Sequence, residues 1–333
     1  MEAMREHSFA AMPSAITTLG RAVEDAAERI RGSVSQTPVE PMSHLVPDEG
    51  TMLFFKMENQ QKTGSFKLRG ASNKILSLSR GDAAKGVIAA SNGNHGLGVA
   101  AAAKSAGIAA EVYVSSHVSP AKARRIEEFG ATNVRSGTDP LEAEVAARAA
   151  ADREERVFIS PYNDFDVMAG QGTIAVELLQ QLPRIDAIFL AVGGGGLIGG
   201  VGAYLKCVSP GTRVVGCWPE NSRVLYESIR AGRIVEFPEQ PTLSESTAGG
   251  LEQGSVTLDV CRTVIDDSVL VSEQEILDAM LQLRDSHRWY VEGAAAVAVA
   301  AFLKESRRFV GQTVVVVICG GNLSPEVRSK LSS

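Results

Sequence analysis

The sequence has few cysteines, no excess of positive charge and no long apolar run, and each absence excludes a class of protein. Its four cysteines form neither a Cys-x-x-Cys pair nor a dense framework, which excludes a disulfide-stapled fold and gives no zinc signature. The formal net charge is −6 and the basic residues are dispersed, so we expect no nucleic acid and no membrane as partner. No apolar stretch reaches membrane-spanning length without a charged or glycine-rich interruption.

What the chain does contain is enough apolar material for a large core. Of its 333 residues, 44% are hydrophobic, which is typical of a soluble globular protein. The length predicts one large α/β unit or two lobes. Residues 1–13 lack the apolar segment of a secretory signal and are interpreted as a loose leader. Together with the unpaired cysteines, this predicts a cytoplasmic protein with reduced thiols.

Short apolar runs alternate with alanine-rich stretches along most of the chain. The runs that we expect to be strands are 52–57, 86–90, 110–114, 187–192, 214–218 and 314–318. The stretches that we expect to be helices are 96–106, 120–129, 140–152, 169–182, 197–205 and 293–305. This alternation predicts βαβ units and a doubly wound α/β fold. Two adjacent strand–loop–helix passages, within 86–134, can form a small lobe.

A run of four glycines is the strongest indication of a ligand. Gly193 to Gly196 follow a predicted strand and open a predicted helix. Glycines let backbone N–H groups crowd around an anion, and a helix N-terminus favours a phosphate, so we interpret this loop as a phosphate site. The pattern Gly194-x-Gly196-x-x-Gly199, with Glu220 about 20 residues on, also fits a dinucleotide fingerprint. A nicotinamide-dependent dehydrogenase therefore stays open, although that fingerprint normally opens the first βαβ unit.

Lys67 follows an aromatic residue and has small residues on both flanks. This setting fits a buried amine, and a neutral amine can form a Schiff base with an aldehyde. Taken alone, a surface lysine at a helix start is an equally good interpretation. Cys319 ends an apolar strand, which fits either a buried thiol or a weak hydrogen-bond partner of a ring nitrogen.

The loop over residues 91–96 offers polar groups at the end of another predicted strand. Ser91, Asn92 and Asn94, with amides freed by the neighbouring glycines, can bind a carboxylate and hydrogen-bond a phenolic oxygen. Asn and Gly are also ordinary turn residues, so the composition alone does not decide. His95 is interpreted as a structural residue packed at the helix start.

Taken together and in this order, these motifs resemble the fold type II pyridoxal-phosphate enzymes, and within them the serine/threonine dehydratase family. The resemblance runs from about Thr37 to the C-terminus and is carried by residues 65–71 (SFKLRGA), 91–96 (SNGNHG), 193–197 (GGGGL) and 319–322 (CGGN). It implies two doubly wound open-sheet lobes with the active site between them. Residues 1–79 and 161–333 would form the large domain and residues 80–160 a small inserted domain.

The resemblance also implies which residues hold pyridoxal 5′-phosphate. Lys67 would carry it as a Schiff base, Asn94 would bond its 3′-oxygen, and Cys319 would face its pyridine nitrogen. The residues implied as cofactor-binding are Phe66, Lys67, Asn94, Gly193, Gly194, Gly195, Gly196, Leu197, Glu292 and Cys319. Those implied as substrate-binding are Ser91, Asn92, Gly93, Asn94 and His95.

The implied reaction is α,β-elimination from a β-hydroxy amino acid such as L-threonine or L-serine, giving a 2-oxo acid and ammonia, with Lys67 as the catalytic base. Racemases of the family carry a serine where this chain has Asn92, and an amide cannot deliver a proton, so racemisation is not expected as the main activity. Residues 248–250 (AGG) resemble a subgroup associated with hydroxyectoine breakdown. This keeps 3-hydroxyaspartate or a hydroxyectoine-derived amino acid open as substrate.

Three further expectations follow from the resemblance. Residues 218–224 lack the carboxylates with which some relatives bind a divalent cation, so we predict no metal. The chain ends soon after Cys319, so we expect no regulatory domain and no feedback inhibition by isoleucine. Dimers are common among relatives, and a homodimer is expected. A non-catalytic protein that only carries the cofactor stays open as an alternative.

Overall fold

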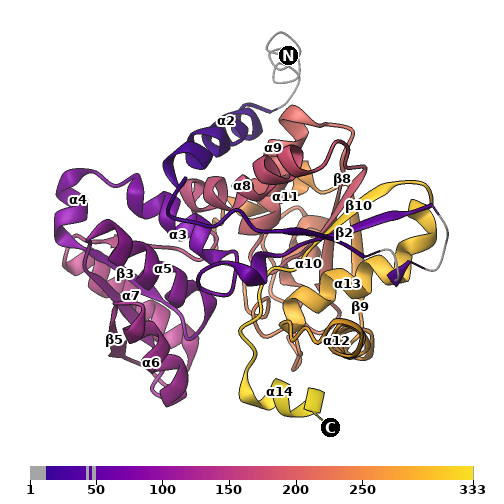
Figure 1. Ribbon diagram of the computed structural model, residues 1–333. Coiled ribbons are helices and arrows are strands. Elements are labelled where there is room, and N and C mark those ends of the chain that lie inside the picture. The colour runs from indigo at the N-terminus through magenta and orange to yellow at the C-terminus, as the bar shows by residue number, and fades with distance from the viewer. Residues whose placement is uncertain (1–12, 43–44, 47–49, 333) are drawn as a thin grey trace.

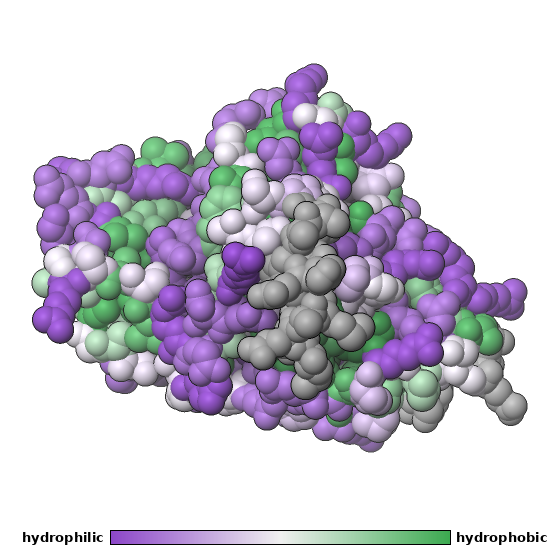
Figure 2. Space-filling model, turned by 90° about the horizontal axis from the view of Figure 1, so that it is seen from above, coloured by the Kyte–Doolittle hydropathy of each residue, from purple (hydrophilic) through white to green (hydrophobic). Residues whose placement is uncertain are grey.

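The computed structural model describes residues 13–42, 45–46 and 50–332. The leader interpreted over residues 1–13 therefore lies, except for Pro13, outside the described residues. Two sheets with flanking helices make up the fold (Figure 1). On the face seen in Figure 2, hydrophilic residues predominate and apolar residues gather in separate patches. None of the described helices is both long and apolar enough to cross a membrane.

The larger sheet has the strand order β1-β2-β10-β7-β8-β9. All its strand pairs are parallel except at one edge, where β1 runs antiparallel to β2. The strands are β1 (Val39–Pro41), β2 (Met52–Lys56), β7 (Ala187–Ala191), β8 (Arg213–Pro219), β9 (Asp267–Val271) and β10 (Thr313–Val317). The central strands β7 and β10 are buried along their whole length, as expected of parallel strands covered on both faces.

Helices cover both faces of this sheet, with α2, α8 and α9 above it and α12 and α13 below it in Figure 1. The helices around it are α2 (Ser14–Arg29), α8 (Phe165–Gln181), α9 (Gly196–Val208), α10 (Val224–Ala231), α11 (Thr257–Val264), α12 (Glu273–His287), α13 (Gly293–Glu305) and α14 (Pro325–Ser332), with the 3-10 turns η2 (Glu58–Gln60) and η3 (Ser306–Phe309). The alanine-rich α13 contacts four neighbouring strands, because small side chains let the helix lie close to the sheet.

The smaller sheet has the order β5-β4-β3-β6 and is parallel throughout. Its elements are α4 (Arg80–Lys85), β3 (Val87–Ala90), α5 (Asn94–Ala106), β4 (Ala110–Val114), α6 (Pro120–Glu128), β5 (Thr132–Arg135), α7 (Pro140–Arg153) and β6 (Val157–Phe158). The predicted doubly wound α/β fold is thus confirmed. The six predicted strands and six predicted helices are present, with small shifts at their ends.

One helix connects the two sheets. α3 (Lys67–Leu76) packs Leu68, Ala71 and Ile75 into the apolar core of the smaller sheet, and it also crosses α8. At that crossing a Cβ on Gly170 would lie 2.6 Å from the Cα of Gly70, so the two backbones touch and only glycine fits. The predicted domain boundaries at 79/80 and 160/161 stay a prediction.

A second glycine crossing joins α8 to α9. A Cβ on Gly200 of α9 would lie 1.9 Å from the carbonyl oxygen of Met168, and one on Gly172 of α8 would lie 2.8 Å from the carbonyl oxygen of Gly200. Because helix backbones this close cannot slide without collision, α8 fixes the start of α3 and the start of α9 relative to each other.

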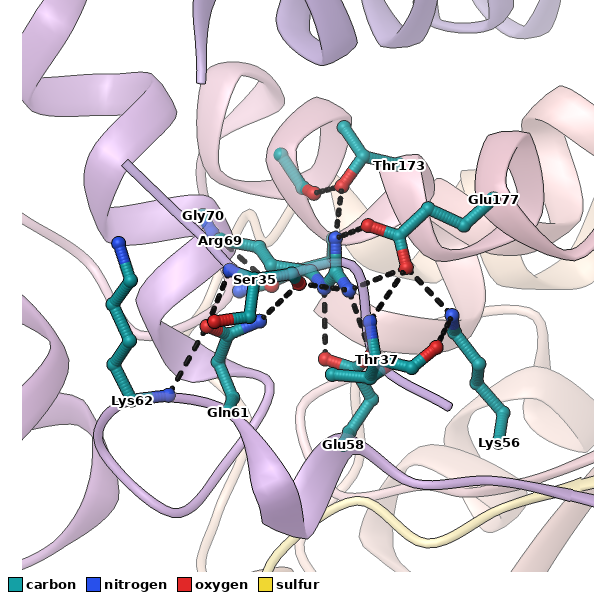
Figure 3. Close-up of polar contacts among 12 residues, drawn as sticks. Ser35, Thr37, Lys56, Glu58, Gln61, Lys62, Arg69, Gly70, Thr173 and Glu177 are labelled. Carbon is teal, nitrogen blue, oxygen red and sulfur yellow. Dashed lines mark hydrogen bonds and ion pairs between the residues drawn. The ribbon is translucent and has the colours of Figure 1, made fainter. Parts of the chain in front are cut away.

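An ionic cluster, defined by Lys56, Glu58, Arg69 and Glu177, is built around Arg69 in the first turn of α3 (Figure 3). The Arg69 guanidinium donates two hydrogen bonds to each carboxylate, at 2.7 and 2.8 Å to Glu58 and at 2.6 and 2.9 Å to Glu177. The Lys56 amine donates to Glu177 at 2.6 Å. The side chains of Lys56, Glu58 and Arg69 are fully buried. Two cations and two anions make the cluster neutral, as burial requires.

The cluster shifts the ionisation of its members in opposite ways. Burial alone would raise the pKa of the Glu58 carboxyl, but the Arg69 guanidinium holds that pKa below its usual range. Burial lowers the pKa of Lys56, against the effect of the two carboxylates. The carboxylate of Glu58 therefore depends on Arg69 for its charge to be tolerated in the core.

We predict that Arg69→Met destabilises the fold by about 3–5 kcal/mol, because it leaves two buried carboxylates without their cation. The measurement is the urea midpoint of unfolding at neutral pH. The control is Arg31→Met, since Arg31 pairs with Glu28 on the surface, and we expect that variant to unfold close to the wild type. Equal midpoints for Arg69→Met and the wild type would contradict the role given to the cluster.

Candidate active site

Lys67 is the first residue of α3, and its amine is turned into the protein. The Nζ atom donates a hydrogen bond to the carbonyl oxygen of Pro161 at 2.7 Å and lies 5.1 Å from the centre of the Phe66 ring. Burial lowers the pKa of Lys67 to about 8. A larger fraction of this amine is neutral near pH 7 than of an ordinary lysine, which makes it a better nucleophile and base.

The backbone around Lys67 is held by the segment that follows β10. The amide of Phe66 donates to the carbonyl oxygen of Cys319 at 3.1 Å, and Ser65 forms an antiparallel bridge with Gly320. Cys319 is buried, and burial raises the pKa of its thiol well above the usual range. The thiol therefore stays neutral beside Lys67 and can act only as a weak hydrogen-bond partner.

The glycine loop lies at the carboxyl end of β7, and each of its four glycines is approached by another part of the chain. A Cβ on Gly193 would lie 2.9 Å from the carbonyl oxygen of Thr247, and one on Gly195 would lie 2.8 Å from the Cys261 sulfur. Gly195 also has a φ of +87°, which disfavours any other residue.

The N-terminus of α9 faces this loop. Among the described residues no side chain caps that terminus, and its first N–H groups have no partner within the helix. The side chain of Leu197, in the first turn, is buried in the apolar core. Leu197 can therefore bind a phosphate only through its backbone N–H. Free amides at a helix start are the donor set that suits a phosphate.

The segment between β6 and α8 joins Lys67 to the glycine loop. Its Pro161 accepts the hydrogen bond of the Lys67 amine. The next residue, Tyr162, lies where a Cβ on Gly194 or Gly196 would be, at 2.4 Å for a ring atom and 2.9 Å for the Tyr162 Cα. Two adjacent residues of this segment thus contact the amine and the glycine loop.

A second polar cluster is built on Glu292, at the start of α13. Its carboxylate accepts hydrogen bonds from the Asn94 amide at 2.9 Å, from the Asn322 backbone at 2.7 Å and from the Ser246 hydroxyl at 2.5 Å. Asn322 also donates to the Oδ1 atom of Asn94 at 2.7 Å. Burial raises the pKa of Glu292, against the effect of these donors. The amide of Asn94 is therefore fixed in orientation by two partners.

The loop over residues 91–96 is held to the next strand. Asn92 donates to the Ser115 hydroxyl at 2.9 Å and accepts from the Ser115 amide at 3.0 Å. The hydroxyl of Ser91 accepts from the amide of Gly93 at 3.0 Å. The loop shape is thus set before any ligand binds.

His95 lies beneath this loop. It is buried, and its Nε2 atom lies 2.8 Å from the carbonyl oxygen of Ile159. Burial, and then the charge of Lys67, lowers its pKa to about 3. The ring is therefore neutral at physiological pH and bonded to the backbone, which fits the structural interpretation. Its place among the substrate-binding residues stays a prediction.

Three residues of this site were given no role in the sequence analysis, although Asn322 stands in the motif at 319–322. Tyr162 follows the short strand β6, Asn322 follows the two glycines after Cys319, and Ser246 lies in a segment without regular structure. A signal existed for Asn322, since it follows a predicted strand whose carboxyl end points to the site, whereas the strand β6 before Tyr162 has only two residues. Nothing in the sequence distinguished Ser246 from other loop serines.

These groups suit a cofactor that has both an aldehyde and a phosphate. The lowered pKa of Lys67 favours the neutral amine that condenses with an aldehyde. The uncapped helix start and the four glycines suit the phosphate. The neutral thiol of Cys319 lies near the amine, and the amide of Asn94 is held in a fixed orientation by Glu292 and Asn322. The residues present therefore fit pyridoxal phosphate.

Comparison with known proteins agrees with this chemistry. A family described as "Pyridoxal-phosphate dependent enzyme" matches residues 30–320. An L-threonine ammonia-lyase of Thermotoga maritima is 38% identical over 301 residues, which are 90% of this chain and 75% of that protein. A serine racemase of Arabidopsis thaliana is 35% identical over 306 residues, 90% of this chain and 92% of that protein.

The structural comparison extends over nearly the whole chain. The solved structure of the processed form of threonine deaminase isoform 2 from Solanum lycopersicum matches with a TM-score of 0.91 at 30% identity, covering 96% of this chain and 94% of that one. The chain belongs to the pyridoxal-phosphate-dependent enzymes, with the fold type II architecture that the sequence motifs implied.

The predicted cofactor, pyridoxal 5′-phosphate, is thereby confirmed, and the protein is a pyridoxal-phosphate-dependent lyase. This decides against the nicotinamide-dependent dehydrogenase that Gly194 to Gly199 left open. Among the described residues, no group of three or more His, Cys, Asp or Glu side chains is placed to hold a metal ion.

We predict that in the cofactor-free protein the Lys67 amine reacts with acetic anhydride along a titration curve centred near pH 8, because burial disfavours its charged form. Limiting acetylation at a series of pH values, followed by mass spectrometry of the Lys67 peptide against an added lysine amide, measures this curve. In urea the same peptide should return to the ordinary lysine value of 10.5. A folded-state curve that coincides with the urea curve would contradict the buried-amine assignment.

Proposed function

We propose that this enzyme converts a β-hydroxy amino acid such as L-threonine or L-serine to a 2-oxo acid and ammonia by α,β-elimination. The observation that carries the proposal is the Lys67 amine, which is half-buried, has a lowered pKa and is linked through Pro161 and Tyr162 to the glycine loop. An amine so placed can serve both as attachment point and as base. The relatives named as threonine ammonia-lyases support this substrate class.

In the proposed reaction Lys67 moves the α-proton. The substrate carboxylate binds the loop of Ser91 to Asn94, and Nζ of Lys67 takes the proton from the α-carbon. The bond from the β-carbon to the hydroxyl then breaks with its electron pair on oxygen, and the departing hydroxide takes the proton held on Nζ of Lys67 to become water. The resulting enamine is hydrolysed by water to the 2-oxo acid and ammonia. When bound, the cofactor supplies the electron sink for the charge at the α-carbon.

The other cofactor-binding residues keep the roles that the family resemblance implies. Asn94, oriented by Glu292 and Asn322, would bond the 3′-oxygen, and Phe66 would pack near the ring. The neutral thiol of Cys319 would face the pyridine nitrogen. A thiol does not protonate that nitrogen, and a weaker electron sink favours elimination over transamination.

Asn92 supports elimination over racemisation. Racemisation needs a second acid on the face of the α-carbon opposite the lysine. Both ends of the Asn92 amide are bonded to Ser115, and an amide cannot deliver a proton. The similarity to serine racemases keeps racemisation as a measurable alternative.

A specialised hydroxy amino acid is the second candidate substrate. Residues 248–250, whose sequence resembles the subgroup associated with hydroxyectoine breakdown, follow Ser246, which bonds Glu292 of the site. This resemblance supports 3-hydroxyaspartate or an amino acid derived from hydroxyectoine as the alternative substrate.

The expected assembly and compartment also stay proposals. All four cysteines are free, which is consistent with a reducing cytoplasm. We propose a homodimer because dimers are common in the family. The site is proposed to bind a small-molecule amino acid as its substrate.

We predict that the holoenzyme releases 2-oxo acid and ammonia in equal amounts from at least one of serine, threonine, 3-hydroxyaspartate and hydroxyectoine-derived amino acids. Removing the base in Lys67→Ala should lower turnover by about 10³-fold or more. The measurements are hydrazone absorbance for the 2-oxo acid and chiral chromatography for the remaining substrate. Racemisation faster than elimination, or no 2-oxo acid from any of the four, would contradict the proposal.

A further inference from the structure

The ring of Tyr162 forms the wall behind the glycine loop. A Cβ added to Gly194 would lie 2.4 to 2.7 Å from three carbon atoms of the ring, so the ring lies against the Gly194 backbone. The main chain of Tyr162 approaches Gly196 in the same way, at 2.9 Å. Tyr162 thus contacts two of the four glycines. The sequence alone did not predict these contacts.

Tyr162 and the residue after it are hydrogen-bonded to the segment over residues 252–256. Its hydroxyl accepts a hydrogen bond from the amide of Glu252 at 3.0 Å. The neighbouring Asn163 donates to the Glu252 carboxylate at 2.8 Å and accepts from the amide of Val256 at 3.0 Å. Burial raises the pKa of Tyr162 above its usual range, so the phenol keeps its proton. The hydroxyl end of the ring is therefore held in place by the Glu252 backbone.

The same segment is tied to the catalytic lysine and to α8. Pro161 accepts the hydrogen bond of Lys67, and Asp164 caps the N-terminus of α8 through the amides of Asp166 and Val167. Any displacement of Tyr162 moves groups at both ends of the site. A rigid wall here keeps the backbone amides of the loop in one arrangement, which lowers the entropy cost of binding an anion.

We propose that Tyr162 is a positioning residue for the cofactor phosphate, acting through the backbone of Gly194 and Gly196. The inference rests on the proposed role of the glycine loop as the phosphate site. It assigns to the ring, rather than to the hydroxyl, the task of holding the loop amides in place. Tyr162 thereby contributes to the preference for a phosphorylated cofactor.

The experiment compares two ligands on cofactor-free protein, pyridoxal 5′-phosphate and pyridoxal. The affinity of each is measured by the visible absorbance of the bound form, and their ratio gives the preference for the phosphate. We expect the wild type to prefer the phosphorylated form by at least about 100-fold, and Tyr162→Ala to lose at least about tenfold of that preference. The phosphorus NMR shift of the bound phosphate should also move toward its value in water.

Three further variants separate the ring from other effects. Tyr162→Phe, which keeps the ring, should retain the preference within about threefold. Tyr162→Leu, which keeps the apolar volume, should fall between Phe and Ala and replaces Ala if Ala does not fold. Phe237→Ala removes a half-buried aromatic ring that packs on Arg223 and should leave the preference unchanged.

The possible failures are distinguishable. If the wild type binds both ligands equally, the glycine loop is not the phosphate site and the proposed role of the loop fails. If the wild type prefers the phosphate but Tyr162→Ala loses affinity for both ligands equally, Tyr162 does not act through the loop and the present inference fails. Loss of the preference in Tyr162→Phe would overturn the assignment to the ring.

Discussion

The neutral ionic cluster behind α3 is the interaction on which the active site depends. Arg69 lies two residues after Lys67 and bonds carboxylates from η2 and α8, elements that are far apart in the sequence. Since each buried charge is tolerated only while its partners are in place, the cluster fixes the start of α3 from behind. The hydrogen bond from Phe66 to Cys319 fixes it in front. The backbone from which the Lys67 side chain extends is thus held on both sides.

Close backbone contacts extend this constraint to the rest of the site. Gly70 against Gly170, and Gly172 against Gly200, fix α3 and α9 on the two sides of α8. The glycine loop at the start of α9 is then set at a defined place relative to Lys67. Such rigidity suits an enzyme whose cofactor carries the electronic part of the reaction, because the protein's task is to orient groups and to exclude competing proton transfers.

The sequence allowed prediction of the parts whose signals are local. Strand and helix alternation, the glycine run and the polar loop around Asn94 are each readable within about ten residues. The cluster around Arg69 could not be predicted, because its partners Glu58 and Glu177 lie 11 and 108 residues away. Tyr162 was not selected because it follows β6, a strand of two residues that is too short to give an alternating pattern. The antiparallel edge strand β1 was missed for the same reason.

The central claim is that the amine of Lys67, and no other, carries pyridoxal phosphate in this fold. The most direct test is to reduce the holoenzyme with sodium borohydride, digest it and locate the phosphopyridoxyl group by mass spectrometry. The account predicts loss of the visible band and a single modified residue, Lys67, with no fixed label in Lys67→Arg. A label on another lysine, such as Lys62 or Lys74, or an unchanged label in the Lys67→Arg variant, would contradict it.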